Sequence, residues 1–276
     1  LLGVGEDSLA VGLAQLLSAG LVISEDNRNY LPPLHQAEAG IAQSLNRLSI
    51  SPSVVELTQT ALAEELQLGR GQHRAIELAV DSKVLVVTGG PGTGKTTVTR
   101  AILRLFERHG LHVALCSPTG RAAKRLSEAT GREAKTIHRL LEFAPGEGVS
   151  RKGVEYRLAT DAIIVDEASM IDVLLMNALL RAIPDRSRLV LVGDVDQLPS
   201  VGPGNVLRDI IDSGQISVVR LAEIFRQGRE SQIVVSAHAI NQGHTPETDN
   251  GKATDFFFVE EPDPERAAGR IEDLCF

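Results

Sequence analysis

Tryptophan is absent from this sequence of 276 residues, and aromatic residues together make up only 3% of it. Side chains on which nucleic-acid bases can stack are therefore sparse, and Phe143 is the one candidate near a basic segment. Cysteine occurs only twice. Cys116 lies in an apolar pattern, which favours a buried thiol in the reducing cytoplasm over a disulfide.

Long apolar runs and an excess of positive charge are also missing. No apolar run reaches 18 residues and no signal segment opens the chain, so we expect no membrane partner and a cytoplasmic location. The net charge is −8, so a site for nucleic acid has to be local. No acidic cluster indicates a metal-dependent nuclease. Because the sequence begins at Leu1 rather than methionine, we expect it to be part of a longer protein.

A glycine-rich motif, G-G-P-G-T-G-K-T, occupies residues 89–96 directly after the apolar run 84–87. Glycines let backbone N–H groups approach phosphate oxygens, and the helix that follows adds its N-terminal dipole. Lys95 can reach the β- and γ-phosphates, and the hydroxyl of Thr96 can bind Mg²⁺. The motif predicts a bound nucleoside triphosphate. Its predicted contacts are Gly90, Pro91, Gly92, Thr93, Gly94, Lys95, Thr96 and Thr97.

Acidic residues follow a second apolar run, at residues 162–165. Asp166 is predicted to bind Mg²⁺, and Glu167 to orient the water that attacks the γ-phosphate. The alternative is that both residues cap the helix predicted from Val173. After a third apolar run, Gln197 can contact the γ-phosphate or the attacking water, or serve only as a turn residue.

Apolar runs that alternate with helical patterns predict an α/β fold, in which helices cover both faces of a parallel sheet. With a P-loop this is a RecA-like domain, which we place at residues 53–217. Residues 218–276 are predicted to begin a second RecA-like domain, with a strand at 256–259 and a helix at 264–274. That second domain is incomplete.

Residues 1–52 follow a different pattern and are predicted to form a small winged-helix-like module with its linker. Four leucines mark one face of a helix, a hairpin follows between residues 21 and 31, and a second helix comes next. We favour packing or spacing over DNA binding as the role of this module.

Residues 118–141 carry six basic and two acidic side chains, a local charge of +4 in a chain of net charge −8. Such an excess on loops and helix starts fits contacts with the phosphates of a nucleic acid. We expect Arg121 and Lys124 to bind phosphates rather than bases. The alternative is a solvated helix face.

Six motifs occur in one order along the chain. They are G-G-P-G-T-G-K-T at 89–96, C-S-P-T-G-R-A-A-K-R-L at 116–126, T-I-H-R-L-L at 136–141, V-D-E-A-S-M at 165–170, L-V-G-D-V-D-Q-L-P at 191–199 and L-A-E-I-F-R-Q at 221–227. Together they resemble motifs I, Ia, Ib, II, III and IV of the RecD-like branch of superfamily 1 DNA helicases, to which the exodeoxyribonuclease V alpha subunit belongs. The resemblance covers roughly residues 66–276.

The resemblance implies roles for further residues. Gln72 matches the glutamine that reads the adenine edge, because its amide both donates and accepts; otherwise it is a solvated residue at a helix start. Arg226 matches an arginine that reaches the γ-phosphate from the second domain, although by itself it is an ordinary surface residue. The implied catalytic residues are Lys95, Glu167, Gln197 and Arg226. The implied contacts with single-stranded DNA are Pro118, Thr119, Arg121 and His138, and for His138 a solvated helix position fits equally well.

The resemblance thus implies an ATP-dependent DNA helicase that uses Mg²⁺. It would move 5′-to-3′ along single-stranded DNA by hydrolysis between two RecA-like domains. The alternative is a non-unwinding, ATP-gated subunit that holds single strands within a larger nuclease complex. The basic segment disfavours an ATPase switch without nucleic acid. Because the second domain is incomplete, we expect residues 1–276 alone to bind ATP and single strands without unwinding DNA.

Overall fold

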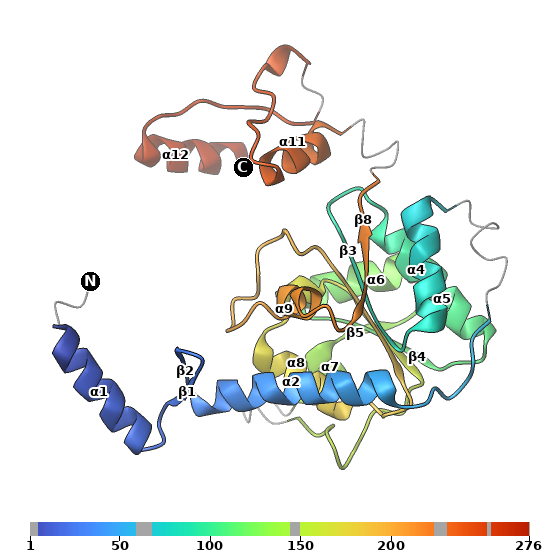
Figure 1. The fold of residues 1–276 in the computed structure, drawn as a ribbon. Helices are drawn as coiled ribbons and strands as arrows, with labels where there is room; N and C mark the ends of the chain where they lie inside the picture. The colour runs from blue at the N-terminus through green and yellow to red at the C-terminus, as the bar shows by residue number, and fades with distance from the viewer. Residues whose placement is uncertain (1–4, 59–67, 144–149, 224–230, 253–254, 276) are drawn as a thin grey trace. The chain divides into compact units, whose positions relative to one another are not determined.

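The computed structural model describes residues 5–58, 68–143, 150–223, 231–252 and 255–275. The chain divides into two compact units, residues 1–89 with 94–223 and residues 90–93 with 224–276. All of the strands described belong to the larger unit (Figure 1). No helix in the described part of the chain is both long and apolar enough to cross a membrane.

Six parallel strands form the central sheet of the larger unit, in the order β5-β4-β6-β7-β3-β8. They are β3 (Val84–Gly89), β4 (Val113–Ser117), β5 (Ala134–Thr136), β6 (Ala162–Val165), β7 (Arg188–Gly193) and β8 (Ser217–Leu221). β6 and β7 are buried throughout, because their mostly apolar residues have helices above and below them. The predicted α/β fold with a parallel sheet is therefore confirmed.

Helices cover both faces of this sheet (Figure 1). One face carries α4 (Arg70–Asp81), α5 (Lys95–Arg108) and α6 (Gly120–Thr130). The other carries α2 (Pro32–Ile50), α7 (Ile137–Leu140), α8 (Val173–Ala182) and α9 (Val206–Asp212). α5 follows the P-loop directly and buries an apolar face that includes Ile102 and Phe106, so its first residues are held at the edge of the sheet.

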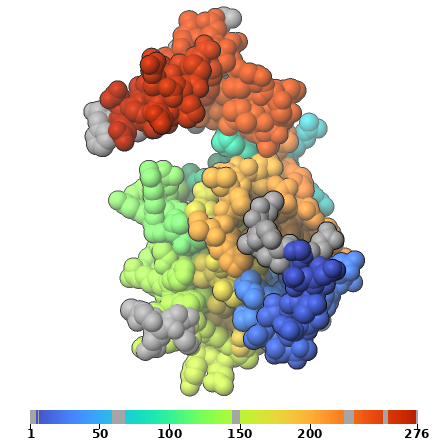
Figure 2. Space-filling view, turned by 90° about the vertical axis from the view of Figure 1, so that its left-hand side faces the viewer, coloured from blue at the N-terminus to red at the C-terminus, as the bar shows by residue number. Residues whose placement is uncertain are grey.

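The N-terminal segment has the predicted order of helix, hairpin and helix, with α1 (Glu6–Ser18), β1 (Ile23–Glu25), β2 (Arg28–Tyr30) and then α2. α2, however, is an integral part of the larger unit. Its residues Ile41, Leu45 and Leu48 are buried in the same core as Met176 and Leu180 of α8. Figure 2 shows the lighter blue residues of α2 next to the yellow and orange segments that follow β6. The predicted separate module therefore does not include α2.

An ion-pair cluster fixes the C-terminal half of α2. Arg47 pairs with the carboxylate of Asp185 and donates to the carbonyl oxygen of Leu180 at 3.0 Å. Arg157 pairs with the same carboxylate, and Lys83 Nζ donates to the carbonyl oxygen of Asp185 at 2.6 Å. Burial, together with nearby arginines, lowers the pKa of Lys83 to about 8. The cluster thus joins α2 to the amino edge of the sheet.

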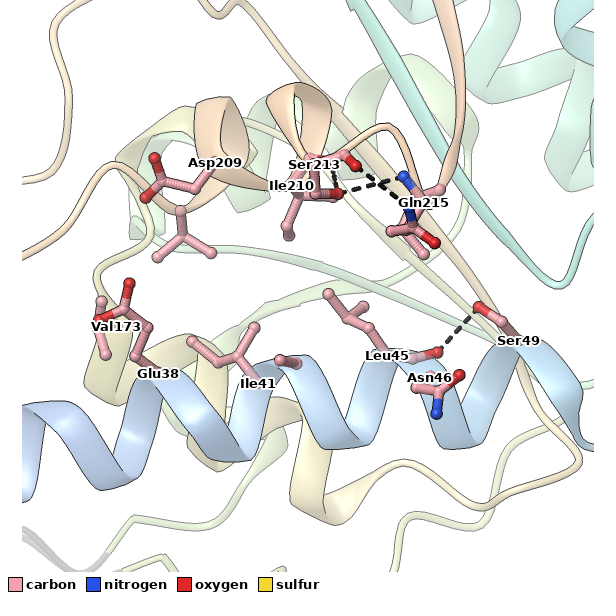
Figure 3. A pocket seen from close by; sticks show the side chains of 13 residues that line it. Glu38, Ile41, Leu45, Asn46, Ser49, Val173, Asp209, Ile210, Ser213 and Gln215 are labelled. Carbon is pink, nitrogen blue, oxygen red and sulfur yellow. Dashed lines mark hydrogen bonds between the residues drawn. The ribbon is translucent and has the colours of Figure 1, made fainter. Parts of the chain in front are cut away.

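A cavity of about 390 Å³ lies between α2 and α9 (Figure 3). Ile41 and Leu45 of α2 face Ile210 of α9 across it, and Glu38 and Asp209 lie at one end. None of the residues predicted to bind nucleotide lines this cavity. α2 therefore packs closely against the sheet, whereas a cavity separates it from α9.

The C-terminal part differs from expectation in two places. β8 pairs with β3, so the first sheet extends past the boundary predicted at residue 217. In the smaller unit, which contains α11 (Gln232–Asn241), η2 (Asn250–Lys252) and α12 (Pro264–Cys275), the predicted C-terminal helix is confirmed. The strand predicted at residues 256–259 is wrong. Phe257, Phe258 and Val259 are exposed, and a β-favouring sequence needs a neighbouring strand to form one.

Candidate functional site

Parallel strands bring the residues that follow them to one edge of the sheet. β6, β7 and β3 are neighbours in that order. β6 leads into Asp166 and Glu167, β7 into Asp194, and β3 into the P-loop. Residues from motifs I, II and III therefore meet at this edge, although they lie far apart in the sequence.

The P-loop has the backbone that close approach to phosphate requires. Gly92 and Gly94 have φ angles of 74° and 82°, in the left-handed region that favours glycine. Gly94 is the N-cap of α5, and Lys95 is its first residue. The first N–H groups of a helix have no partner within it, so this end of α5 is suited to an anion.

Asp194 connects the P-loop to motif III. Its carboxylate is buried and lies 3.8 Å from Nζ of Lys95, which also donates to the carbonyl oxygen of Gly89 at 2.6 Å. The same carboxylate accepts from Gln197 Nε2 at 3.2 Å. The sequence patterns assigned a role to Gln197 and none to Asp194. The signal that marks it is its place directly after a strand that is buried throughout.

The acid pair, Asp166 and Glu167, lies in a partly desolvated position. Burial raises the pKa of Asp166 and of Glu167, the neighbouring charge of Asp166 raises that of Glu167 further, and Lys95 lowers both. Asp194 also raises the pKa of Glu167, and Arg125 lowers it. Three carboxylates, including that of Asp194, thus lie near only two cations, Lys95 and Arg125. This leaves a net negative charge around the site.

That residual charge fits a divalent cation. The hydroxyl of Thr96 at the start of α5 and the carboxylate of Asp166 are oxygen ligands of the kind that Mg²⁺ prefers. A bound Mg²⁺ would supply charge that offsets phosphate oxygens. Thr96 and Asp166 are its predicted ligands.

Glu167 has an unusual backbone. Its φ angle is 55°, a left-handed conformation that costs a residue other than glycine about 1–3 kcal/mol. The alternative role for the acid pair, capping α8, is taken by Asp172, whose Oδ1 accepts from the N–H of Leu175 at 2.8 Å. The strained backbone of Glu167 therefore has no role in starting that helix.

Gln72 is buried, so the alternative of a solvated residue at a helix start is wrong. Its Oε1 accepts from the N–H of Gly69 at 3.1 Å, and its Nε2 lies 3.5 Å from the carbonyl oxygen of Gly94. The amide thus joins the start of α4 to the P-loop.

The predicted single-strand contacts follow β4 and β5. Arg121 and Lys124 are exposed on α6, and the hydroxyl of Thr119 caps that helix by accepting from the N–H of Ala122. His138 is exposed on α7, and its ring centroid lies 5.0 Å from that of Phe143. Pro118, between β4 and α6, is half-buried. Arg226 lies outside the described residues.

Gly193 ends β7 against the turn of motif II. A Cβ on this residue would lie 3.0 Å from the backbone nitrogen of Ser169 and 2.8 Å from Cδ2 of Leu207. We expect Gly193→Ala to push the motif II turn away from Asp194 and to lower the free energy of unfolding by about 1–3 kcal/mol. Urea denaturation of the chain measures this. The matched control is Gly12→Ala in α1, where nothing lies within 4 Å of the added methyl. Equal stability of the two variants would contradict the close packing at Gly193.

Comparisons with known proteins identify relatives of this chain. Residues 72–203 match the family model described as the AAA domain. The chain is 36% identical over 241 residues to the ATP-dependent RecD2 DNA helicase of Deinococcus radiodurans, a match that covers 84% of this chain and 32% of the relative. It is 42% identical over 164 residues to the RecBCD enzyme subunit RecD of Mycobacterium tuberculosis, covering 51% of this chain and 28% of the relative.

Among solved structures, the Pif1 helicase from Candida albicans matches with a TM-score of 0.47 and 25% identity, over 65% of this chain and 45% of that one. The chain spans about a third of the length of the curated relatives it matches. These relatives confirm the resemblance that the six ordered motifs predicted.

Proposed function

We propose that this relative of the RecD-like helicases is part of a longer ATP-dependent DNA helicase, which moves 5′-to-3′ along single-stranded DNA in the cytoplasm. The observation that carries the proposal is the contact of one buried carboxylate, Asp194, with both Lys95 and Gln197. Through this carboxylate, a change in the contacts that Lys95 makes at the γ-phosphate position can alter the loop that carries motif III.

In this proposal ATP occupies the P-loop, and each surrounding residue has one task. Thr96 and Asp166 hold Mg²⁺, and Lys95 binds the β- and γ-phosphates. Glu167 orients the attacking water, and its raised pKa suits a group that also accepts a proton from that water. Gln197 exchanges its bond with Asp194 for one with the γ-phosphate.

Two further residues complete the proposed nucleotide site. Gln72 presents its amide to the adenine edge next to the P-loop. Arg226 stabilises transition-state charge from the second domain.

Single-stranded DNA would bind along Pro118, Thr119, Arg121, Lys124 and His138. The charge of Arg125 on α6 lowers the pKa of Glu167, which supports a DNA path along α6 on the same side of the site as the acid pair. A second candidate function is an ATP-gated subunit of a nuclease-helicase complex. It is favoured by the relatives named as RecD subunits of the RecBCD enzyme.

A strand-displacement assay with 5′-tailed and 3′-tailed duplexes tests the helicase proposal. We expect the longer protein to displace the labelled strand only from 5′-tailed duplexes, and the 276-residue chain to displace neither. ATP-dependent binding of single strands without displacement by the longer protein would favour the subunit function instead. Displacement by the 276-residue chain would contradict the need for a complete second domain.

The basic face of α6 gives a separate prediction. Arg121→Ala and Lys124→Ala should weaken single-strand binding equally for all sequences, because these residues are expected to bind phosphates. Each should lower the slope of log affinity against log salt by roughly 0.7. Fluorescence anisotropy across salt concentrations measures it, with Arg186→Ala, an exposed arginine at the opposite edge of the sheet, as the control. A loss that depends on base sequence would contradict phosphate binding.

A further inference from the structure

Ser117, the last residue of β4, carries a buried hydroxyl with an unused donor. The residue is 0% exposed, and its Oγ has no hydrogen-bond partner. Nearly all buried polar groups in folded proteins are paired, and leaving one unpaired lowers stability. In the described part of the chain, the buried side-chain atoms without a partner are Ser117 Oγ, Ser169 Oγ and Asn177 Oδ1. A buried hydroxyl that contributes nothing to folding calls for a functional reason.

Strand register places Ser117 beside Asp166. Cys116 on β4 pairs with Val165 on β6. The N–H of Asp166 donates to the carbonyl oxygen of Cys116 at 2.9 Å, so the ladder continues past the end of β6. The next two residues in register are therefore Ser117 and Asp166.

Both side chains belong to the same face of the sheet. Cys116 and Val165 lie in the core on the α8 side, whereas Leu115 and Ile164 lie in the core on the α5 side. Because side chains alternate between faces along a strand, Ser117 and Asp166 are assigned to the α5 side. That is the side on which α5 begins with Lys95, next to the P-loop.

Adjacent strands lie about 4.8 Å apart, so a serine and an aspartate in register are within reach of a hydrogen bond. Rotation of one serine side-chain torsion between staggered positions can aim the hydroxyl at the neighbouring carboxylate. An ionised carboxylate accepts such bonds well, because the bond is assisted by charge. The carboxylate of Asp166 is partly desolvated, and the backbone N–H of Glu167 also donates a hydrogen bond to it.

Ser117 also touches the segments proposed to hold DNA. It pairs with Thr136 of β5, whose hydroxyl caps α7 by accepting from the N–H of Arg139. In the other direction it directly precedes Pro118 and Thr119. One residue therefore lies between the acid pair and both proposed single-strand segments.

We propose that Ser117 is a positioning residue whose hydroxyl donates a hydrogen bond to the carboxylate of Asp166 and orients it as a ligand of Mg²⁺ when Mg·ATP binds. The inference rests on the proposed Mg·ATP site. Hydrogen bonds to a ligating carboxylate fix its orientation, and removing such a bond commonly weakens metal binding by about 10–100-fold. The same bond would transmit movement of the 118–121 segment to the metal ligand.

The test compares Ser117→Ala with Ser169→Ala in the complete 276-residue chain. Both variants remove a buried, unpartnered hydroxyl, but only Ser117 lies in register with Asp166. A fluorescent ATP analogue is titrated with and without Mg²⁺, and the ratio of the two Kd values gives the gain in affinity due to the metal. We expect Ser117→Ala to reduce that gain by roughly 10–100-fold, with metal-free affinity unchanged, and Ser169→Ala to keep the full gain.

Thermal unfolding without nucleotide provides the second readout. Neither substitution should lower the melting temperature, since each removes a hydroxyl that has no partner to lose. An unchanged metal-dependent gain in Ser117→Ala, or a lowered melting temperature, would overturn the proposal while leaving the ATP site intact. No binding of the analogue by the unsubstituted chain, with or without Mg²⁺, would overturn the proposed function itself.

Discussion

Lys95→Ala is expected to abolish ATP hydrolysis, whereas Glu167→Gln should keep ATP binding and stop turnover. Lys95 lies at the first position of α5 with its ammonium at the edge of the sheet, so its removal leaves the phosphates without their main cation. Glutamine at position 167 keeps the shape of the side chain but cannot accept a proton from water. The loss of rate should be on the order of 10³-fold or more, equivalent to several kcal/mol of barrier.

Calorimetric titration of ATP into the 276-residue chain measures the binding part of this prediction. Phosphate release by the longer protein measures turnover. Glu77→Gln, which changes a half-buried glutamate on α4 that pairs with Arg74 and lies outside the proposed site, is the matched control and should leave both unchanged. Near-normal phosphate release in Glu167→Gln would remove Glu167 from its proposed role, even if Lys95→Ala behaves as expected.

Leu48→Ala is expected to lower the free energy of unfolding by about 2–5 kcal/mol, a large part of the stability of a domain of this size. Leu48 lies on α2 and is 0% exposed, in the same core as α8 and the central sheet. Its truncation therefore leaves a cavity within the core of the larger unit and not within a separate module. Urea denaturation followed by circular dichroism measures the change.

The control for this prediction is Ile50→Ala on the same helix, because Ile50 is 77% exposed. That substitution should change stability by less than about 0.5 kcal/mol. If Leu48→Ala behaved like Ile50→Ala, α2 would not be docked against α8 in solution. The boundary predicted near residue 52 would then be the right one.

The strands β3, β6 and β7 and the P-loop were predictable because their signals are local. An uninterrupted apolar run identifies each buried strand, and the glycine spacing identifies the loop that follows β3. The docking of α2 was not predictable in this way. Its apolar face fits a small independent module as well as a larger core, and only the packing partner on α8 distinguishes the two.

In the candidate site too, some residues were predictable from local motifs and others were not. The acid pair and Lys95 are marked by motifs, and the structure places both at one edge of the sheet. The roles of Asp194 and Ser117 depend on strand order and register, which bring β7 next to β3 and β4 next to β6. An aspartate or serine after a strand is common, so these residues become distinctive only once the neighbouring strand is known. Similarly, β8 joins β3 through pairing that no local pattern reveals.

The left-handed backbone of Glu167 lowers the stability of the fold, although the proposed chemistry needs a glutamate at this position. Glycine fits that conformation without strain, and asparagine tolerates it better than glutamate does. A directed-evolution experiment that rewards heat resistance alone should therefore enrich Gly or Asn at position 167. The variants recovered would be more robust proteins and poor ATPases. Thermostabilisation of this chain is best done with position 167 held fixed, because the same substitution there would raise stability and remove activity.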